Sequence, residues 1–484
     1  MRLSFEEIVR AVDGSAVAGA APCGIVEGVG TDSRAVKPGS LFVCIPGETF
    51  DGHDFAVKAI EAGAAALLVS RNPFDAVPPV PLILVEDTVK ALGKLAHCWR
   101  ERLGETRVIG LTGTAGKTTV KELLAQVLSR RGPTAKTHMN LNNQIGLPLS
   151  MLAATGEEAF WVMEAGISHP NDMDELGAIL EPDLALILNV GPGHAAGLGD
   201  RGTAHYKSKL LAHLAPGGTA IISADYPDLA REARAVRQEL VFFSTSGRQV
   251  DYRAAYVVPA GEDKGLFRLW LDGVSIDVEA PFRGAFGAEN VIAVAAVAHR
   301  LGLGAEEIAA GFAGAALPKQ RFACSRAGDW LVIDDSYNAN PLSFSRMLEA
   351  AAEMAGDHAD RPLVCVLGEM GELGSLSEDE HRNLGRLVVG LQAMKDITYE
   401  QCENLARAIW KGGHLEEFED GLHAGRYGGA FCPVTSAEDM FKGLAACDLG
   451  SGGGVILFKG SRSNKLETLV SAFTEAQAGE PHAV

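Results

Sequence analysis

Residues 110–124 read GLTGTAGKTTVKELL and place a glycine-rich turn between an apolar run and a helical pattern. The apolar run that leads into the turn, RVIGL at 107–111, predicts a buried strand. After the turn, apolar residues recur three and four positions apart from Val120 to Leu128, which is the spacing of one helix face. A strand, a tight loop and a helix in this order indicate an α/β fold, in which such a loop opens on the ligand crevice.

The loop has the composition of a phosphate-binding site. Gly113 and Gly116 let the backbone wrap closely, so that amide groups and the helix N-terminus point at an anion. Lys117 adds a positive charge for the outer phosphates, and the Thr118 hydroxyl can ligate Mg²⁺. Leucine stands at position 111, where the longer P-loop pattern has its first glycine, so the form present is TGxxGKTT. The motif specifies no reaction, but it predicts nucleotide binding through Gly113, Thr114, Ala115, Gly116, Lys117, Thr118 and Thr119.

Three further apolar runs, at 160–166, 184–194 and 219–225, are nearly continuous. Such runs are typical of parallel strands that are buried on both faces, with helices between them. The stretch LFRLWLDGVSIDVEA at 266–280 alternates instead, and Asp272-Gly273 at its middle predicts a tight hairpin. The central part of the chain is therefore predicted to hold a mostly parallel, P-loop-type sheet flanked by helices.

The chain is too long for one core, since 484 residues at the usual domain size of ~100–200 residues predict about three domains. A further series of strand-like runs, WLVIDD, LVCVLGEM and GVILFKGSR, begins after LPKQRF at 317–322. We predict a smaller α/β N-terminal domain at 1–100, the central P-loop domain at 101–316 and a Rossmann-like C-terminal domain at 317–484.

The composition is that of a globular protein, with 47% hydrophobic and 22% charged residues and a formal net charge of −19. Nucleic acid and anionic membranes attract clustered Lys and Arg, so neither is an expected partner. There is no basic-then-apolar leader and no stretch of the roughly 18–20 apolar residues that a membrane span needs, which predicts a cytoplasmic protein. The eight cysteines are scattered without a CxxC pair, which favours reduced thiols over a metal site.

Two polar residues come at or after the ends of buried-type strands. Glu164 lies in the run FWVMEAG, and His194 lies a few residues past the end of the next predicted strand. The carboxyl ends of parallel strands meet at the ligand crevice, so both residues are candidate ligands of a nucleotide-bound Mg²⁺. The run LVIDD at 331–335 imitates a Walker B strand, but it lies far downstream in another predicted domain, so we prefer Glu164.

Taken together, the motifs resemble those of the ATP-dependent Mur ligases over nearly the whole chain. TGTAGKTT (112–119) is similar to the phosphate loop of that family, and NLNNQIGLP (140–148) is similar to the asparagine-rich loop of its dipeptide-adding members. The stretch that begins TDSR, at 31–55, resembles its N-terminal domain, which grips the UDP end of the substrate. Three more stretches resemble its C-terminal domain: DDSYNANP (334–341), VLGEMGELG (366–374) and FKGSR (458–462). The DNPR motif expected of the ligase that adds the diamino acid does not occur.

The resemblance implies an ADP-forming amide ligase that uses ATP and Mg²⁺ to join D-alanyl-D-alanine to UDP-N-acetylmuramoyl-tripeptide in peptidoglycan precursor synthesis. The tripeptide carboxylate would attack the γ-phosphate to give an acyl phosphate, and the dipeptide amine would displace phosphate. Such chemistry requires mainly positioning and charge neutralisation. Two alternatives stay open: another amino-acid or peptide ligase of the Mur/folylpolyglutamate superfamily, and a non-catalytic P-loop nucleotide switch.

The resemblance also implies roles for individual residues, and a monomer is the expected state. The implied catalytic residues are Lys117, His194 and Lys207, the last aligning with a lysine that the family carbamylates. The implied metal ligands are Thr118, Glu164, His194 and Lys207. The implied nucleotide contacts outside the loop are Asn290, Arg321, Asp335, Tyr337 and Asn338. The implied substrate contacts are Ser33, Arg34, Asn140, Asn142 and Asn143, with Asp32 expected to order its own loop.

The chain departs from the family pattern at three places. Lys209 stands where an acidic residue is usual, and Glu289 stands where the family has a histidine before the adenine-contacting asparagine. The stretch 391–447 has weak strand character and many charges, so we expect a rearranged region there.

Overall fold

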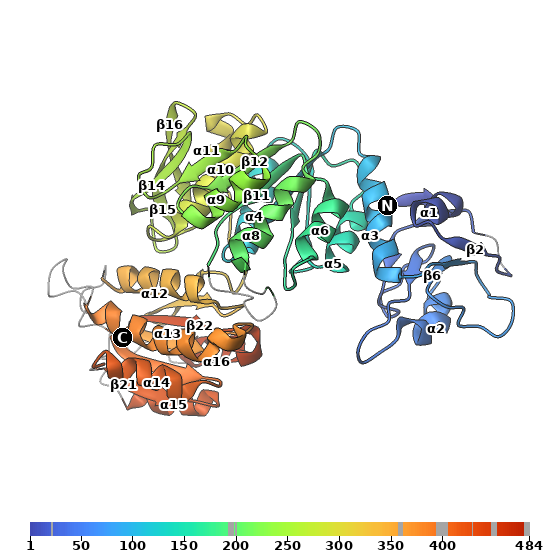
Figure 1. Ribbon diagram of the computed structural model, residues 1–484. Coiled ribbons are helices and arrows are strands. Elements are labelled where there is room, and N and C mark those ends of the chain that lie inside the picture. Colours follow the sequence, from blue (N-terminus) through green and yellow to red (C-terminus); the bar gives the residue numbers. More distant parts are fainter. Residues whose placement is uncertain are drawn as a thin grey trace.

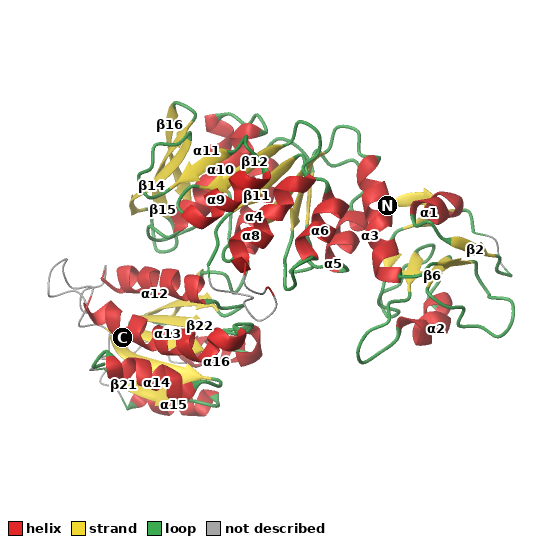
Figure 2. Ribbon diagram, viewed as in Figure 1, coloured by secondary structure: helices red, strands yellow, loops and turns green. Residues whose placement is uncertain are grey.

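The computed structural model describes residues 1–20, 23–191, 198, 201–356, 362–393, 405–427, 429–446 and 453–478. Within these ranges the chain forms three bodies in sequence order, and the N-terminal and C-terminal bodies both adjoin the central one (Figure 1). Each of the three bodies contains both helices and strands (Figure 2). The prediction of a three-domain α/β protein is confirmed, while the domain limits at residues 100 and 316 stay predictions.

The N-terminal body is built on a small sheet in the order β2-β7-β6-β5-β4, beside a β1–β3 pair. The helix α3 (Thr88–Glu101) leaves this body and packs against α5 and α6 of the central body, so it joins the two. The other helices are α1 (Phe5–Ala11) and α2 (Ala56–Glu61). The strands are β1 (Arg2–Ser4), β2 (Ser15–Val17), β3 (Ile25–Glu27), β4 (Val29–Gly30), β5 (Leu41–Val43), β6 (Ala66–Val69) and β7 (Leu82–Leu84).

The central sheet has the order β16-β15-β14-β13-β12-β11-β8-β10-β9, and its pairs from β9 to β14 are parallel. The hairpin prediction is confirmed, because β15 and β16 pair antiparallel around Asp272-Gly273, whose φ values of 48° and 91° suit a two-residue turn. The strands are β8 (Arg107–Thr112), β9 (Thr134–Lys136), β10 (Phe160–Glu164), β11 (Leu184–Ile187), β12 (Thr219–Ser223), β13 (Val241–Ser244), β14 (Tyr252–Pro259), β15 (Gly265–Leu271) and β16 (Val274–Ala280).

Helices cover both faces of this sheet, which explains the continuous apolar runs of its strands. Along β11, Leu184 and Leu186 join the core cluster that contains α4 and α10, whereas Ala185 and Ile187 join the cluster on the other face. The helices are α4 (Lys117–Leu128), α5 (Gly146–Ala153), α6 (Asp172–Leu180), α8 (Gly202–Ser208), α9 (Pro227–Val236), α10 (Gly287–Arg300) and α11 (Ala305–Ala313). The carboxyl ends of β8, β10 and β11 consequently meet where α4 begins.

The C-terminal sheet has the order β17-β18-β22-β19-β20-β21, parallel except for β17. The expectation of a rearranged stretch at 391–447 stays a prediction, but its described part contains a regular strand. This strand, β20, pairs parallel with β19, with a register shift between Leu363 and Val364, and Ala408, Ile409 and Trp410 are buried. The strands are β17 (Ala323–Ala327), β18 (Trp330–Asp335), β19 (Leu363–Gly368), β20 (Leu405–Lys411), β21 (Ala430–Pro433) and β22 (Val455–Lys459). The helices are α12 (Pro341–Gly356), α13 (Ser377–Ala393), α14 (Leu415–Ala424), α15 (Ala437–Ala445) and α16 (Glu467–Ala478).

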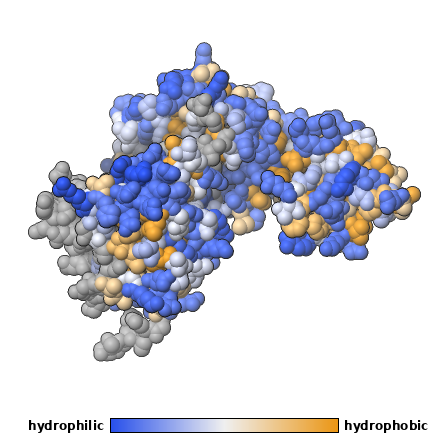
Figure 3. All heavy atoms as spheres, turned by 60° about the horizontal axis from the view of Figure 1, so that its bottom comes forward, coloured by the Kyte–Doolittle hydropathy of each residue, from blue (hydrophilic) through white to orange (hydrophobic). Residues whose placement is uncertain are grey.

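The visible surface is mainly hydrophilic, and apolar side chains stand out on the N-terminal body (Figure 3). Exposed apolar residues there include Phe50, Val57 and Val77, and scattered apolar exposure of this kind is normal for a folded protein. A search of the described helices finds none long and apolar enough to cross a membrane. The cysteines within the described ranges are free thiols, as predicted.

Candidate active site

The predicted phosphate loop connects β8 to the N-terminus of α4. Gly116 caps this helix in a left-handed conformation with φ 81°, and a Cβ at this position would lie 2.7 Å from Asn290 Oδ1, so a larger residue would be strained and would displace the Asn290 side chain. The helix opens with free amides because the first turn of any helix has no internal acceptor for them. The Lys117 ammonium folds back and donates to the Gly113 carbonyl at 2.8 Å. The loop is therefore shaped for an anion.

A buried asparagine holds the first half of the loop. Asn189, which follows β11, accepts hydrogen bonds through its Oδ1 from the amides of Thr114 at 3.0 Å and Ala115 at 2.8 Å. Its Nδ2 donates to the Ala115 carbonyl and to the Glu289 carboxylate. The loop is thus ordered by side chains from two neighbouring elements.

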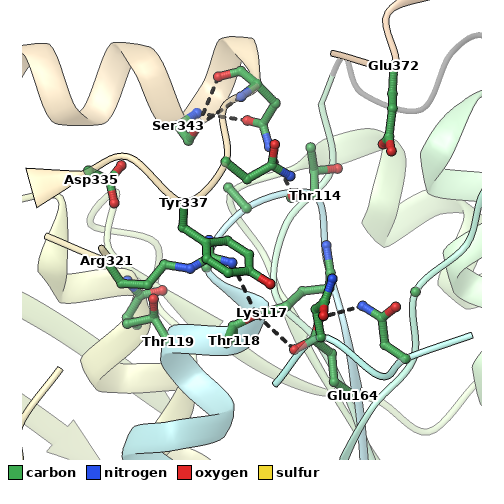
Figure 4. A pocket seen from close by; sticks show the side chains of 18 of the residues that line it. Thr114, Lys117, Thr118, Thr119, Glu164, Arg321, Asp335, Tyr337, Ser343 and Glu372 are labelled. Atoms are coloured by element: carbon green, nitrogen blue, oxygen red, sulfur yellow. Dashed lines mark hydrogen bonds between the residues drawn. The ribbon is translucent and has the colours of Figure 1, made fainter. Parts of the chain in front are cut away.

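The loop forms one wall of a pocket of ≈ 390 Å³ between the central and C-terminal bodies. In Figure 4, Arg321 and Tyr337 reach from the C-terminal side toward Lys117, Thr118 and Glu164. The pocket is lined by these predicted residues: Thr114, Ala115, Gly116, Lys117, Thr118, Thr119, Asn140, Asn142, Asn143, Glu164, Asn290, Arg321, Asp335, Tyr337 and Asn338. The fold therefore gathers at one place residues that are more than 200 positions apart.

The two bodies touch at the loop itself. Arg321 lies 3.4 Å from the Thr118 hydroxyl through its Nη2 and stacks on the Tyr337 ring, with 4.1 Å between the guanidinium carbon and the ring centre. Asn340 donates to the Thr114 carbonyl at 3.2 Å. Such contacts close the pocket around the phosphate loop from the C-terminal side.

The Asp335 carboxylate lines the pocket but is already engaged with protein groups. One oxygen accepts from the Phe322 amide at 3.0 Å and the other accepts from the Lys459 ammonium at 2.5 Å. Lys459 is fully buried, and burial lowers its pKa while the Asp335 charge raises it. Through these two contacts Asp335 fixes the carboxyl end of β18, in addition to any contact it makes with a nucleotide.

Two of the predicted metal ligands, Thr118 and Glu164, lie next to Lys117. In the pairing of β10 with β8, Glu164 stands opposite Leu111, so its carboxylate emerges next to the loop. This buried carboxylate accepts from the Thr118 hydroxyl at 3.0 Å and from Asn142 Nδ2 at 2.8 Å. Oxygen ligands of this kind fit Mg²⁺. No cluster of three His, Cys, Asp or Glu residues that could hold a metal is found in the described ranges, which exclude His194.

Lys207 is the most unusual group near the site. Its side chain is completely buried on α8 and its Nζ has no hydrogen-bond partner among the described residues. Burial, reinforced by the nearby Lys117 charge, holds the pKa of Lys207 well below its ordinary 10.5. The neighbouring Lys209, which departs from the family pattern, turns away and pairs with Asp174 at 2.6 Å.

The predicted contacts of the first domain lie apart from this pocket. Ser33 and Arg34 occupy the loop between β4 and β5, and Arg34 pairs with Asp32 in the exposed loop. Asp32 also accepts from the Arg34 amide at 3.0 Å, and these bonds hold its pKa at about 2. This agrees with the expectation that Asp32 orders its own loop, whereas substrate contact by Ser33 and Arg34 stays a prediction.

Three residues of this network were missed from the sequence. Asn189 is a polar residue inside the predicted apolar run at 184–194, and this interruption is a signal that could have identified it. Glu289 drew notice only as a departure from the family pattern. Arg346 lies inside α12, and it pairs with Glu289 at 2.7 Å while donating to the Tyr226 hydroxyl at 2.8 Å. Nothing in the sequence distinguishes this arginine from a solvated helix residue.

Comparison with known proteins agrees with this geometry. The chain matches the Mur ligase family, catalytic domain, at 25–100, the Mur ligase middle domain at 111–298 and the Mur ligase, glutamate ligase domain, at 320–462. The chain belongs to the Mur ligase family. This membership confirms the resemblance that the motifs indicated.

The relatives of this Mur ligase match it almost end to end. The UDP-N-acetylmuramoyl-tripeptide–D-alanyl-D-alanine ligase of Escherichia coli K12 is 35% identical over 93% of this chain and 94% of that protein. The enzyme of the same name from Bacillus subtilis is 33% identical over 93% of this chain and 94% of its own. A crystal structure of MurF from Acinetobacter baumannii has a TM-score of 0.85 at 30% identity and covers 98% of this chain and 99% of that one. MurF from Thermotoga maritima, crystallised in complex with ADP, has a TM-score of 0.79 at 27% identity, covering 93% of this chain and 98% of that one.

Proposed function

We propose that this Mur ligase joins D-alanyl-D-alanine to UDP-N-acetylmuramoyl-tripeptide and converts ATP to ADP and phosphate in doing so. The observation that carries the proposal is the pocket in which the phosphate loop faces Arg321 and Tyr337 of the C-terminal body. Family membership and the shared name of the near-full-length relatives support the same activity.

The chemistry follows from the placement of positive charge. The terminal carboxylate of the tripeptide attacks the γ-phosphorus, ADP leaves, and an acyl phosphate results. The free amine of D-alanyl-D-alanine then attacks the acyl carbon and gives up a proton, the amide bond forms, and inorganic phosphate leaves with the electron pair of the broken C–O bond. Lys117 and Arg321 stand beside Thr118, where they stabilise charge on the transferred phosphate. Closure of the C-terminal body excludes water, which would otherwise compete with the amine.

The residues around Thr118 fit a magnesium ion. The Thr118 hydroxyl and the Glu164 carboxylate would hold it, and His194 is a further proposed ligand that lies outside the described residues. Bound there, Mg²⁺ neutralises negative charge on the nucleotide phosphates. Lys207, near Lys117 and Glu164, is the proposed site of a carbamate. Its buried amine has no hydrogen-bond partner among the described residues, and its lowered pKa keeps it neutral, so that it can capture carbon dioxide.

The remaining assignments rest on position in the fold. The N-terminal body, through Ser33 and Arg34, binds the UDP end of the substrate, since the guanidinium fork suits a diphosphate. Asn140, Asn142 and Asn143 line the pocket and contact the peptide. Asn290, Asp335 and Asn338, which also line it, contact the nucleotide. We further propose that the enzyme acts as a monomer in the cytoplasm.

Phosphate release tests the proposal. Purified protein is given ATP, Mg²⁺ and UDP-N-acetylmuramoyl-tripeptide, with and without D-alanyl-D-alanine, and phosphate and the amide product are measured. We expect both only when the dipeptide is present. Phosphate release that ignores the dipeptide, or release without amide product, would exclude this ligase activity.

A further inference from the structure

A second lysine of the phosphate-loop helix, Lys121, is buried in a way that the reaction does not explain. It lies one turn after Lys117 on α4, and its side chain has 0% exposure. A buried ammonium is costly unless all of its donors find acceptors. The location of those acceptors therefore shows what the charge holds in place.

The acceptors of Lys121 belong to the chain that enters the asparagine-rich loop. Its Nζ donates to the carbonyls of Thr137 at 2.8 Å and Met139 at 2.7 Å, and it lies 3.2 Å from the Glu122 carboxylate. Met139 has a φ of 49°, a left-handed conformation that residues other than glycine rarely adopt. The ammonium supplies the interaction that offsets this strain, so it holds the backbone in the conformation from which the loop starts.

The same segment is tied to Glu164 at two points. The Thr137 hydroxyl accepts a hydrogen bond from the Glu164 amide at 2.8 Å. On the far side of the turn, Asn142 donates to Glu164 Oε1 at 2.8 Å and accepts through its carbonyl from Gly166. The Glu164 carboxylate also accepts a hydrogen bond from the Thr118 hydroxyl. Thr118 lies on α4, three residues before Lys121. Helix α4, the asparagine-rich loop and Glu164 are therefore connected to one another by hydrogen bonds.

We propose that Lys121 is a positioning residue that sets the asparagine-rich loop against Glu164, so that the peptide-binding side chains and the Thr118–Glu164 pair adopt one common geometry. This inference rests on the proposed function, because the loop is assigned to the peptide substrate. Lys121 itself does not line the pocket and contacts no reacting group. Its effect passes through Thr137, Met139 and Asn142.

The test compares Lys121→Met with Lys136→Met. Methionine keeps the apolar stem and removes the charge, and Lys136 is a matched control because it pairs with the same Glu122 from an exposed position. We expect Lys121→Met to raise the KM for UDP-N-acetylmuramoyl-tripeptide by at least about tenfold, since two hydrogen bonds from a charged donor are lost. The affinity for ADP, which depends on the phosphate loop, should change less than about threefold, and Lys136→Met should change neither.

Two further measurements separate positioning from general destabilisation. Amide hydrogen exchange in the peptide that covers 138–146 should become at least about tenfold faster in Lys121→Met, while exchange in β8 stays as in the wild type. In an Asn142→Ala background, the effect of Lys121→Met on this KM should be much smaller, because both residues act on the same contact. If Lys121→Met does not fold, Lys121→Arg is measured in the same way, since it keeps a cation but displaces the donors.

The outcomes are distinct. Equal losses of ADP and UDP-substrate affinity, or full additivity with Asn142→Ala, would overturn the positioning role. Unchanged loop exchange would overturn it as well. A wild-type protein that releases no dipeptide-dependent phosphate would overturn the proposed function instead, and the exchange measurement would still decide whether Lys121 orders the loop.

Discussion

Removal of Arg346 tests how the C-terminal body is held over the phosphate loop. Its guanidinium lies 2.7 Å from Glu289 across the interface, and the exposed fractions of the two side chains are 17% and 6%. Breaking such a buried pair from one side costs ~3–5 kcal/mol because a charge is left uncompensated. The substitution Arg346→Met keeps the apolar stem of the side chain and leaves the Glu289 carboxylate without this partner.

The loss of ADP binding energy in Arg346→Met should be smaller than this full cost, for two structural reasons. Glu289 keeps a hydrogen bond from Asn189 at 2.8 Å, and the C-terminal body can move away and let water reach the carboxylate. The closed state is therefore weakened by about 1.5–3 kcal/mol, which corresponds to a roughly 10- to 100-fold loss of ADP affinity. Because Asn189 donates to Glu289 and accepts from the amides of Thr114 and Ala115, a displaced Glu289 also disturbs the phosphate loop.

Titration calorimetry with ADP measures the effect, and Arg326→Met is the matched control. Arg326 pairs with Glu262 across the same two bodies, but the two side chains are 39% and 50% exposed, so its loss should cost less than about 1 kcal/mol. The double variant Arg346→Met/Glu289→Gln should bind ADP more tightly than Arg346→Met alone, because the orphaned charge is removed. Wild-type ADP affinity in Arg346→Met, or weaker binding in the double variant, would refute the reasoning.

Three other perturbations have defined outcomes. Gly116→Ala should abolish measurable ADP binding, because a Cβ would meet Asn290 Oδ1 at 2.7 Å and φ is 81°, whereas Gly104→Ala, with open space around it, should bind ADP like the wild type. Burial raises the pKa of the Cys365 thiol to about 12, so this thiol should resist iodoacetamide at pH 8.5 in the native protein and react after unfolding. Peptide mass spectrometry measures the extent of alkylation in both states. Equal alkylation rates in the native and unfolded protein would contradict the burial of this thiol. Lys207→Met should be inactive yet more stable than the wild type in CO₂-free buffer. The pKa of Lys207 in the folded protein lies below its ordinary 10.5, so between these two values the unfolded chain binds more protons than the folded one. The difference in unfolding free energy between Lys207→Met and the wild type should therefore shrink as pH rises through that window. Denaturant titrations at several pH values measure it, and a constant difference would contradict the burial cost.

The outline of the fold could be predicted because its signals are local. The run at 107–111, the turn at Gly116 and the helical spacing after Val120 each depend on residues close together in the chain. The buried runs of the central sheet were equally clear, since strands covered on both faces have no polar positions to interrupt them. The weak point was β20, where charged residues surround a short core of Ala408, Ile409 and Trp410. This strand is stabilised by its place in the sheet between β19 and β21.

The sequence by itself determined a phosphate loop on a parallel α/β sheet and, through its motifs, the Mur ligase family. Only the tertiary structure decided which polar residues are removed from water. By local sequence alone Lys121, Lys207 and Lys459 look like ordinary solvated lysines, and only the family resemblance singled out Lys207. All three are fully buried. Lys121 donates to backbone carbonyls, Lys459 pairs with Asp335, and the Lys207 amine has no hydrogen-bond partner within the described part of the chain. Burial and pairing depend on side chains that approach from distant parts of the chain, so no local pattern encodes them, and the free energy that they cost or contribute exists only once the bodies have packed.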